Sequence, residues 1–304
     1  MIRRTYLGLD IRPESLYAVA LLRQGTGASL SGGRMIGLDR GILELSVREP
    51  NIADRARFIQ AVREVLDPLA GKEDRIALAL PDQIGRVLLT EVETAFKSRD
   101  EGVEVVKWQL KNSLPTEARN VQLDYQVLER TENGRYRLMV SLMVKSVLQQ
   151  YEEALAEAGY NAALIDFHSV NLYNYYRSRL ESGEDFILVG VEGNSFSLQY
   201  YHGRLPVFHR TKRIALEPGK VFQEVNLSCA GFRDSQPGFV RAPVYLHTDW
   251  PEREPLLEAL RSAFERDVVL LDPRLDRMAK TPLNLAAGRD MEIVAAVGVT
   301  ERLL

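Results

Sequence analysis

The stretch Phe186–Arg210, FILVGVEGNSFSLQYYHGRLPVFHR, constrains the fold more than any other part of the chain. Its apolar residues alternate in three runs, and the turn-like clusters Glu192–Ser195 and His202–Arg204 separate the runs. Apolar residues at every second position, broken by clusters of Gly, Asn and Ser, are typical of antiparallel strands joined by tight turns. The stretch therefore predicts a three-stranded β-meander.

The same pattern occurs near the N-terminus, displaced by about 180 residues, and such self-similarity is the signature of a repeat. Two apolar runs there flank the turn Arg12-Pro13-Glu14-Ser15. Without a gap, Leu9 aligns with Val189 and Ser15 with Ser195. Two interpretations stay open. Any two β-hairpins resemble each other, or the chain is a duplicated α/β fold whose two hairpins face each other across a cleft.

The length and charge of the chain exclude several classes of protein. Its 304 residues are enough for two domains with their own cores. The net charge of −3 at pH 7 gives no reason to expect nucleic acid or an anionic membrane surface as a partner. No apolar run approaches the roughly 18 to 20 residues of a membrane-spanning helix, and the N-terminus lacks the pattern of a signal peptide. We therefore expect a cytoplasmic protein without direct membrane insertion.

The cysteine and histidine content argues against metal and thiol chemistry. The single cysteine, Cys229, excludes a disulfide framework or a thiolate zinc site within one chain, and its apolar surroundings indicate a buried structural thiol. The four histidines lack metal-ligand spacing, so we expect them at turns or on the surface, and we predict no metal site. They are His168, His202, His209 and His247.

Asp166 and His168 follow a predicted strand and have the composition of an acid/base pair. Catalysis by such a pair requires a third group that orients it. The neighbouring sequence offers none, and no nucleophile elbow, P-loop or dinucleotide fingerprint occurs in the chain. We therefore predict no catalytic residue.

Periodicity divides the chain into two halves, with an insert in the first. Residues 1–82 have the pattern of two strands, a helix over 53–70 and a further strand. Residues 161–182 return to the same domain, and a polar run then leads into the second half, 183–304, which we predict to be a second core domain with its own subdomain.

Residues 83–160 have a different texture and predict a compact insert with the order β-α-β-β-α. Two of its strands, over 121–129 and 136–145, are joined by Asn133-Gly134, a strong hairpin signal. Outside the insert, weak strand signals occur over 34–36 and 42–48, and residues 24–33 are expected to form a loop.

Two facing β-turns across a cleft are a suitable place for the phosphates of a nucleotide, because backbone N–H groups in small-residue turns donate to phosphate oxygens. These turns fit that role poorly. The first carries Arg12 and Pro13, and a proline has no N–H to donate. The second begins with Glu192, whose charge repels a phosphate unless a metal lies between them. Asp10 is placed either to hold a metal-bound water or to accept hydrogen bonds at a strand end.

Several short motifs occur in a distinctive order. Leu7–Ile11 reads LGLDI, Lys107–Pro115 is a helix-like segment closed by proline, and Leu123–Leu128 reads LDYQVL. A late Leu-Asp-Pro and an apolar C-terminal stretch, AAVGV over 295–299, follow. This series resembles the PilM-type proteins of type IV pilus assembly, an actin-like ATPase fold that also includes the cell-division protein FtsA and the cytoplasmic domain of the secretion protein GspL. The most specific match is LDYQVL.

The resemblance covers nearly the whole chain and implies its fold class. We expect an α/β protein with a duplicated actin-like, or ribonuclease H-like, fold and an inserted small α+β subdomain. Its nucleotide site would be formed by residues at the two facing turns. Those residues are Asp10, Arg12, Ser15, Glu192, Gly193, Asn194 and Ser195.

The departures from the family pattern fall on that site. The glycine of the opening motif is Arg12, and the glycine of the second copy is Glu192. The late glycine pair that holds the adenosine in the family is replaced by 247–249, His-Thr-Asp. We therefore expect a degenerate site with no cofactor, or with weakly bound MgATP.

By resemblance, the chain is a cytoplasmic scaffold, peripheral at the inner membrane, and its partner is the N-terminal cytoplasmic peptide of a PilN-type membrane protein, together with other components of the pilus assembly platform. In the family this peptide lies between the first core domain and the insert. The candidate partner-binding residues are Trp108, Leu123, Tyr125 and Val127. The alternative is that these residues form the core of the insert.

Two other functions stay open at this point. The chain is alternatively a functional actin-like ATPase, or the cytoplasmic domain of a longer GspL-like secretion protein. Whether the protein is an enzyme is not decided by the sequence, although the altered turns favour a scaffold.

Overall fold

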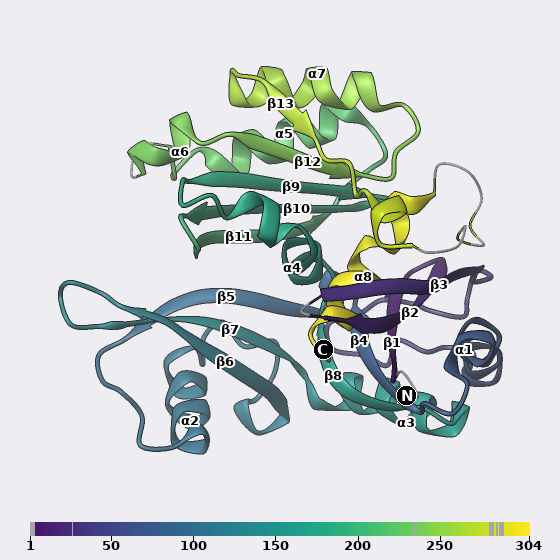
Figure 1. Ribbon diagram of the computed structural model, residues 1–304. Coiled ribbons are helices and arrows are strands. Elements are labelled where there is room, and N and C mark those ends of the chain that lie inside the picture. Colours follow the sequence, from purple (N-terminus) through teal and green to yellow (C-terminus); the bar gives the residue numbers. More distant parts are fainter. Residues whose placement is uncertain (1–3, 26, 234–235, 280–282, 284, 286–288) are drawn as a thin grey trace.

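The structure is a computed structural model that describes residues 4–25, 27–233, 236–279, 283, 285 and 289–304. Its described part contains two five-stranded mixed sheets, a smaller three-stranded sheet, and helices that lie outside and between them (Figure 1). In the described residues, no helix has both the length and the apolar character that crossing a membrane requires.

The two large sheets have the same topology, strand for strand. In each, a three-stranded antiparallel meander is extended by two parallel strands on the side of its first strand. The first sheet has the order β3-β2-β1-β4-β8, formed by β1 (Thr5–Arg12), β2 (Ser15–Gln24), β3 (Gly27–Gly37), β4 (Arg75–Leu80) and β8 (Asn161–Phe167). The second has the order β11-β10-β9-β12-β13, formed by β9 (Phe186–Glu192), β10 (Ser195–His202), β11 (Leu205–Arg213), β12 (Val244–Thr248) and β13 (Val268–Leu270).

This agreement confirms the predicted duplicated α/β fold. The first turn joins Arg12 to Ser15 and the second joins Glu192 to Ser195, so the two turns occupy equivalent places in the two sheets.

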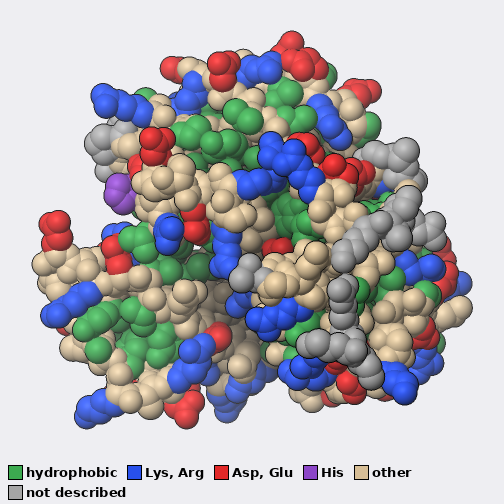
Figure 2. All heavy atoms as spheres, in the orientation of Figure 1, with side chains coloured by type: hydrophobic (Ala, Val, Ile, Leu, Met, Phe, Trp, Pro, Cys, Tyr) green, Lys and Arg blue, Asp and Glu red, His purple; other side chains and the backbone are tan. Residues whose placement is uncertain are grey.

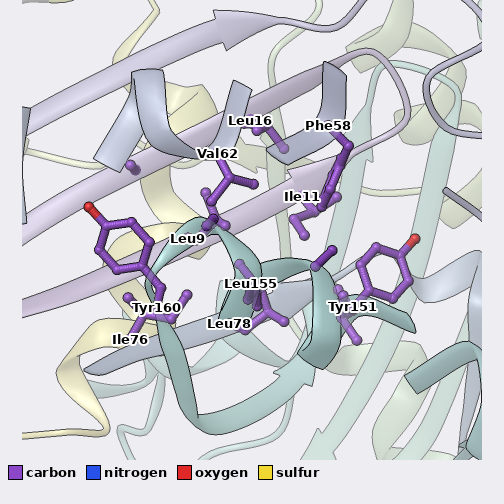
Figure 3. Close-up of a cluster of buried hydrophobic side chains, with 14 of the residues drawn as sticks. Leu9, Ile11, Leu16, Phe58, Val62, Ile76, Leu78, Tyr151, Leu155 and Tyr160 are labelled. Atoms are coloured by element: carbon purple, nitrogen blue, oxygen red, sulfur yellow. The ribbon is translucent and has the colours of Figure 1, made fainter. Parts of the chain in front are cut away.

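Helices cover the outer face of each large sheet. On the first sheet, α1 (Arg55–Ala70) and α3 (Lys145–Ala158) bury a core in which Phe58 and Tyr151 meet edge to face (Figure 3). On the second sheet, α5 (Pro218–Cys229) and α7 (Arg253–Phe264) bury the corresponding core, and the short α6 (Pro237–Arg241) lies beside them. Cys229 belongs to this second core, as expected of a structural thiol.

Two further helices, α4 (His168–Leu180) and α8 (Val294–Glu301), lie between the two large sheets (Figure 1). They share one apolar core with side chains from both sheets, among them Val19 and Leu188. The turn of 3₁₀ helix η4 (Asp290–Ile293) leads into α8. This central layer is therefore the apolar joint of the two halves.

The insert forms a separate lobe beside the first sheet. Its strands pair in the order β5-β7-β6, and α2 packs on their core. Short 3₁₀ turns η1 (Asp82–Ile84), η2 (Ala118–Asn120) and, in the second half, η3 (Leu275–Arg277) connect larger elements. The elements of the lobe are β5 (Gly85–Val92), α2 (Arg99–Gln109), β6 (Val121–Arg130) and β7 (Tyr136–Val144).

Two local predictions were wrong. The stretch 24–33 is not a loop, because β3 runs through most of it. Its glycines weaken the strand signal, but a Cβ on Gly32 would lie 2.7 Å from Cδ2 of Leu69 on α1, so the bare backbone lets the helix approach. Residues 42–48 form no strand and contribute one isolated bridge, between Leu43 and Ile52.

The predicted domain boundaries stay predictions, and two helices bear on them. The helix α3, grouped with the insert at 83–160, contributes its buried face to the core of the first sheet. The helix α8, grouped with the second half at 183–304, packs on α4 and on β1 and β4 of the first sheet.

We expect Gly298→Ala to destabilise the joint between α8 and α4. An added Cβ at Gly298 would overlap the carbonyl oxygen of Asn171 and lie 3.2 Å from the backbone nitrogen of Tyr175, so the two helix backbones must separate. Overpacking of this kind costs about 1–3 kcal/mol of unfolding free energy, measurable by urea denaturation. Gly37→Ala is the matched control, since its Cβ would meet no heavy atom within 4 Å. Equal stability of the two variants would contradict the tight packing.

Candidate functional site

The turns after β1 and β9 lie on opposite sides of a cavity of about 380 Å³. Both predicted turns line it, together with residues that follow β12 and residues near η4. Of the seven predicted nucleotide-site residues, six line this cavity, namely Arg12, Ser15, Glu192, Gly193, Asn194 and Ser195. The seventh, Asp10, is fully buried beside them. The structure therefore brings the predicted residues together from both halves.

The side chain of Arg12 crosses the space between the two turns. Its Nε donates to Oδ2 of Asp10 at 2.9 Å, and its Nη1 donates to Oδ2 of Asp249 at 3.2 Å. Its Nη2 lies 2.9 Å from Oε1 of Glu192 and donates to the backbone carbonyl of Glu292. The guanidinium also lies over the ring of Tyr17, 4.4 Å from its centroid. One cation is thus bound by carboxylates of both halves.

A second cation is His168, the first residue of α4, which contacts two of the carboxylates that Arg12 contacts. Its Nδ1 is 2.9 Å from Oδ1 of Asp10, and its Nε2 is 2.5 Å from Oε2 of Glu192. Two carboxylates facing the two ring nitrogens require both nitrogens to carry protons. His168 therefore joins the ends of β1 and β9 in the same way as Arg12.

His247, on β12, completes the buried cluster. Its Nδ1 lies 2.8 Å from the hydroxyl of Tyr176, and its Nε2 lies 3.2 Å from Oε1 of Glu192. Neither this Nε2 nor Oε1 of Glu192 has a hydrogen-bond partner among the described residues, although both the Arg12 and His247 nitrogens are at ion-pair distance from the oxygen. Attraction to the positive charge of Arg12, rather than an aligned hydrogen bond, therefore holds this oxygen.

The pKa values of the cluster follow from these contacts. Burial by itself lowers the pKa of His168, but the charges of Asp10 and Glu192 and the hydrogen bonds to them outweigh it and raise that pKa to about 10. Burial likewise lowers the pKa of Arg12, and the surrounding carboxylates raise it well above its usual value. Burial raises the pKa of Glu192, but Arg12 and His168 hold it well below its usual range. His168, Arg12 and Glu192 are therefore charged at neutral pH.

A shorter polar chain lies next to this cluster. The backbone N–H and the hydroxyl of Ser169 both donate to the buried carboxylate of Asp82, at 3.1 Å and 2.5 Å, and Nε2 of His209 is 3.0 Å from the hydroxyl. Burial raises the pKa of Asp82 to about 6 and lowers the pKa of His209 to about 4. Because the serine lies between the acid and the histidine, this is not the order of a Ser-His-Asp triad.

Three features of the two turns are unfavourable for the phosphates of a magnesium nucleotide. The N–H of Gly193, the donor that the second turn would offer to a phosphate, already donates to Oδ1 of Asp249 at 2.9 Å. Pro13 has no donor in the first turn. The carboxylates of Asp10, Glu192 and Asp249 all face the Arg12 guanidinium, so a phosphate would compete with them for that cation. In the described part of the chain, no group of three or more His, Cys, Asp or Glu residues could hold a metal ion.

The histidines were expected at turns or on the surface. This expectation was wrong for His168 and His247, which are buried and contact polar side chains of the cluster. Local sequence carries no sign of their partners, because Asp10 is 158 residues from His168 along the chain. One sequence signal did point to the network. Arg12 and Glu192 have opposite charges at equivalent positions of the two repeats.

A larger groove of about 950 Å³ lies between the insert and the first sheet, and reaches the β10–β11 hairpin. In Figure 2 the surface is hollowed between the insert, at the lower left, and the rest of the molecule. Strand β6, an edge strand of its sheet, lines the groove with Asp124–Leu128, and α4 lines it with Val170, Tyr173, Asn174 and Arg177.

The four candidate partner-binding residues fall in different places. Tyr125 and Val127 line the groove, and Val127 is 49% exposed. Leu123 is buried in the core of the insert. Trp108 lies outside the groove on α2, 71% exposed, with Nζ of Lys111 5.4 Å from its ring centroid. The alternative, that all four form the core of the insert, therefore does not hold for Trp108 and Val127.

Comparison with solved structures identifies the fold. The chain is similar over 99% of its length to 99% of a chain described as a "PilM-PilN type IV pilus biogenesis complex", at 20% sequence identity and a TM-score of 0.75. A Bacteroides thetaiotaomicron protein with an actin-like ATPase fold and unknown function is similar over 90% of this chain and 95% of its own, at 12% identity and a TM-score of 0.56. The cytoplasmic domain of EpsL, an inner membrane component of the type II secretion system of Vibrio cholerae, is similar over 97% and 94%, at 10% identity and a TM-score of 0.54.

No protein-family model matches the chain, and no curated protein matches it significantly. At these identities the likeness establishes the fold, and it confirms the actin-like architecture that the sequence motifs implied.

The proton on His168 gives the stability of the protein a defined dependence on alkaline pH. The pKa of His168 is raised from the ordinary histidine value of 6.5 to about 10 in the folded protein, so its contribution to stability is complete below pH 6.5 and is lost as pH rises toward 10. We expect the unfolding free energy to fall through this window, by at most about 1.4 kcal/mol per pH unit for one proton. Urea denaturation at a series of pH values measures it.

His168→Gln is the control variant for this pH dependence. It removes the imidazole, while Cys229 and the tyrosines, which also titrate at alkaline pH, are unchanged. The variant is expected to be less stable at neutral pH and to lose less stability between about pH 7 and 10. The same slope in both proteins would show that His168 carries no linked proton.

Proposed function

We propose that this chain is a PilM-type scaffold of a type IV pilus or related secretion apparatus, located at the cytoplasmic face of the inner membrane through its partners. The observation that carries the proposal is the side chain of Arg12, which lies between the two turns where a nucleotide would bind. The fold likeness to the PilM-PilN complex over 99% of both chains supports the pilus assignment. In this proposal the nucleotide site is degenerate and the scaffold binds no cofactor.

The partner we propose is the N-terminal cytoplasmic peptide of a PilN-type membrane protein, bound in the groove between the insert and the first sheet. In the part of the chain that the structure describes, the outer edge of β6 pairs with no other strand and presents backbone N–H and C=O groups to an extended peptide. At Tyr125 the N–H donates to Oδ1 of Asp124 and the C=O accepts from Arg99, so a peptide would displace these side chains there. Tyr125 and Val127 lie beside that edge, and apolar side chains of Met139, Ile165 and Val170 line the groove. This arrangement provides main-chain hydrogen bonds for affinity and pockets for side-chain recognition.

Two other functions remain candidates, each with one observation in its favour. A functional actin-like ATPase is favoured by the cavity of about 380 Å³ that remains beside Ser15, Asn194 and Ser195. A GspL-like secretion component is favoured by the fold likeness to the EpsL cytoplasmic domain. A gene that continues into a membrane-spanning helix after Leu304 would favour the GspL-like component over the ATPase.

The degenerate site predicts that millimolar MgATP and MgADP leave the thermal midpoint of unfolding unchanged. A ligand at one hundred times its Kd would stabilise the native protein by about 2.7 kcal/mol, which a thermal-shift titration detects. Magnesium chloride alone and inorganic phosphate are the controls for ionic effects. A saturable, nucleotide-specific rise in the midpoint would reject the degenerate site and favour the ATPase.

The peptide groove predicts that substitutions in its lining weaken binding of the PilN-type peptide. Val127→Asp places a charge where an apolar contact is expected and should raise Kd at least about tenfold, or 1.4 kcal/mol, as measured by calorimetry. Trp108→Ala, outside the groove, should leave Kd unchanged. The reverse result, with loss only in Trp108→Ala, would place the peptide on the exposed face of α2 instead.

A further inference from the structure

The two halves of the molecule are joined in two chemically different ways. At the joint, α4 and α8 fill the space between the sheets with an apolar core that includes Leu172, Tyr176 and Ala296. At the open end, where the turns after β1 and β9 approach each other, the contacts are between charged groups. The apolar core limits separation at the joint, and the charged contacts oppose opening of the cleft at its mouth.

Arg12 is the group on which those charged contacts converge. It is the last residue of β1 in the first half, and two of its three carboxylate partners lie in the second half, where Glu192 ends β9 and Asp249 follows β12. Its side chain is 12% exposed, so water screens these pairs weakly. The planar guanidinium donates in several directions at once, which a single ammonium group on a lysine cannot reproduce.

His168 also connects carboxylates of the two halves, and it lies deeper in the cleft than Arg12. It lies between Asp10 of the first half and Glu192 of the second, with both ring nitrogens engaged. Without the two cations, the carboxylates of Asp10, Glu192 and Asp249 would face one another across the buried cleft and repel. With Arg12 and His168 in place, the charged groups on the two sides of the cleft attract one another, and without them they would repel.

We propose that Arg12, supported by His168, is a built-in cation that holds the two halves in one closed arrangement without a bound ligand. The positive charge that links the carboxylates of the two halves then comes from a side chain of the protein and not from a bound ligand. Closure is then a fixed property of the folded protein. The proposal concerns the arrangement of the halves and does not depend on peptide binding in the groove.

The proposal has a direct test in the distance between spin labels on the two sides of the cleft. Glu14, in the first turn, and Glu254, at the start of α7, are exposed, and the only native cysteine, Cys229, is buried, so cysteines introduced at these two positions are labelled selectively. In the otherwise native protein, electron paramagnetic resonance should give one narrow distance distribution, with or without MgATP.

Arg12→Met keeps a side chain of similar length and removes the charge. We expect its distance distribution to broaden and shift by several ångström to longer values, while Arg57→Met, which breaks an exposed pair with Asp39, leaves the distribution unchanged. Arg12→Lys should lie between native and Arg12→Met. A folded Arg12→Met with the native distribution would overturn the proposal.

If Arg12→Met fails to fold by circular dichroism, Glu192→Gln takes its place. It removes the charge of the second-half carboxylate that both Arg12 and His168 contact, and leaves Arg12 paired with Asp10. Broadening in this variant supports the proposal, and an unchanged distribution overturns it. A MgATP-dependent narrowing of the native protein would also overturn it, since closure would then require a ligand.

Discussion

The buried guanidinium of Arg12 is the interaction on which the arrangement of this cleft depends. Three carboxylates approach one another there from β1, β9 and the segment after β12, at a place shielded from water. Burying one unpaired charge costs several kcal/mol, and breaking a buried pair by removing one partner typically costs about 3–5 kcal/mol. The position of the second half relative to the first is therefore tied to the presence of a cation, and the chain supplies it as a side chain.

The charged contacts of the cleft and the apolar joint lie in different parts of the molecule. At the two turns, Pro13 has no N–H to donate and the N–H of Gly193 is already engaged by Asp249, while α4 and α8 fill the joint with an apolar core. The groove beside β6 shares no lining residue with the cavity between the turns. Substitutions in the groove lining and at the two turns therefore alter separate sites.

Much of the fold could be predicted from the sequence because the duplication presents the same strand-turn-strand signal twice. The strand signal over 34–36 marked only the end of β3. Its first part was missed because a glycine there serves helix packing, a tertiary requirement that local propensity does not contain. In the site, the two turns were found because turn signals are local. His168, His247 and Asp249 follow or end other strands, and only the pairing of β8 with β4 and of β12 with β9 brings them to the same cleft.

The pairing of Arg12 with Glu192 has a consequence for how such a chain can vary. The two residues occupy equivalent positions of the two repeats and neutralise each other across the pseudo-symmetric interface. A change at either one alone leaves a buried charge without its counterpart, so each position determines which residues the other tolerates. Substitutions at the two sites are thereby coupled. Replacing both residues by small ones passes through a destabilised single variant unless both positions change together.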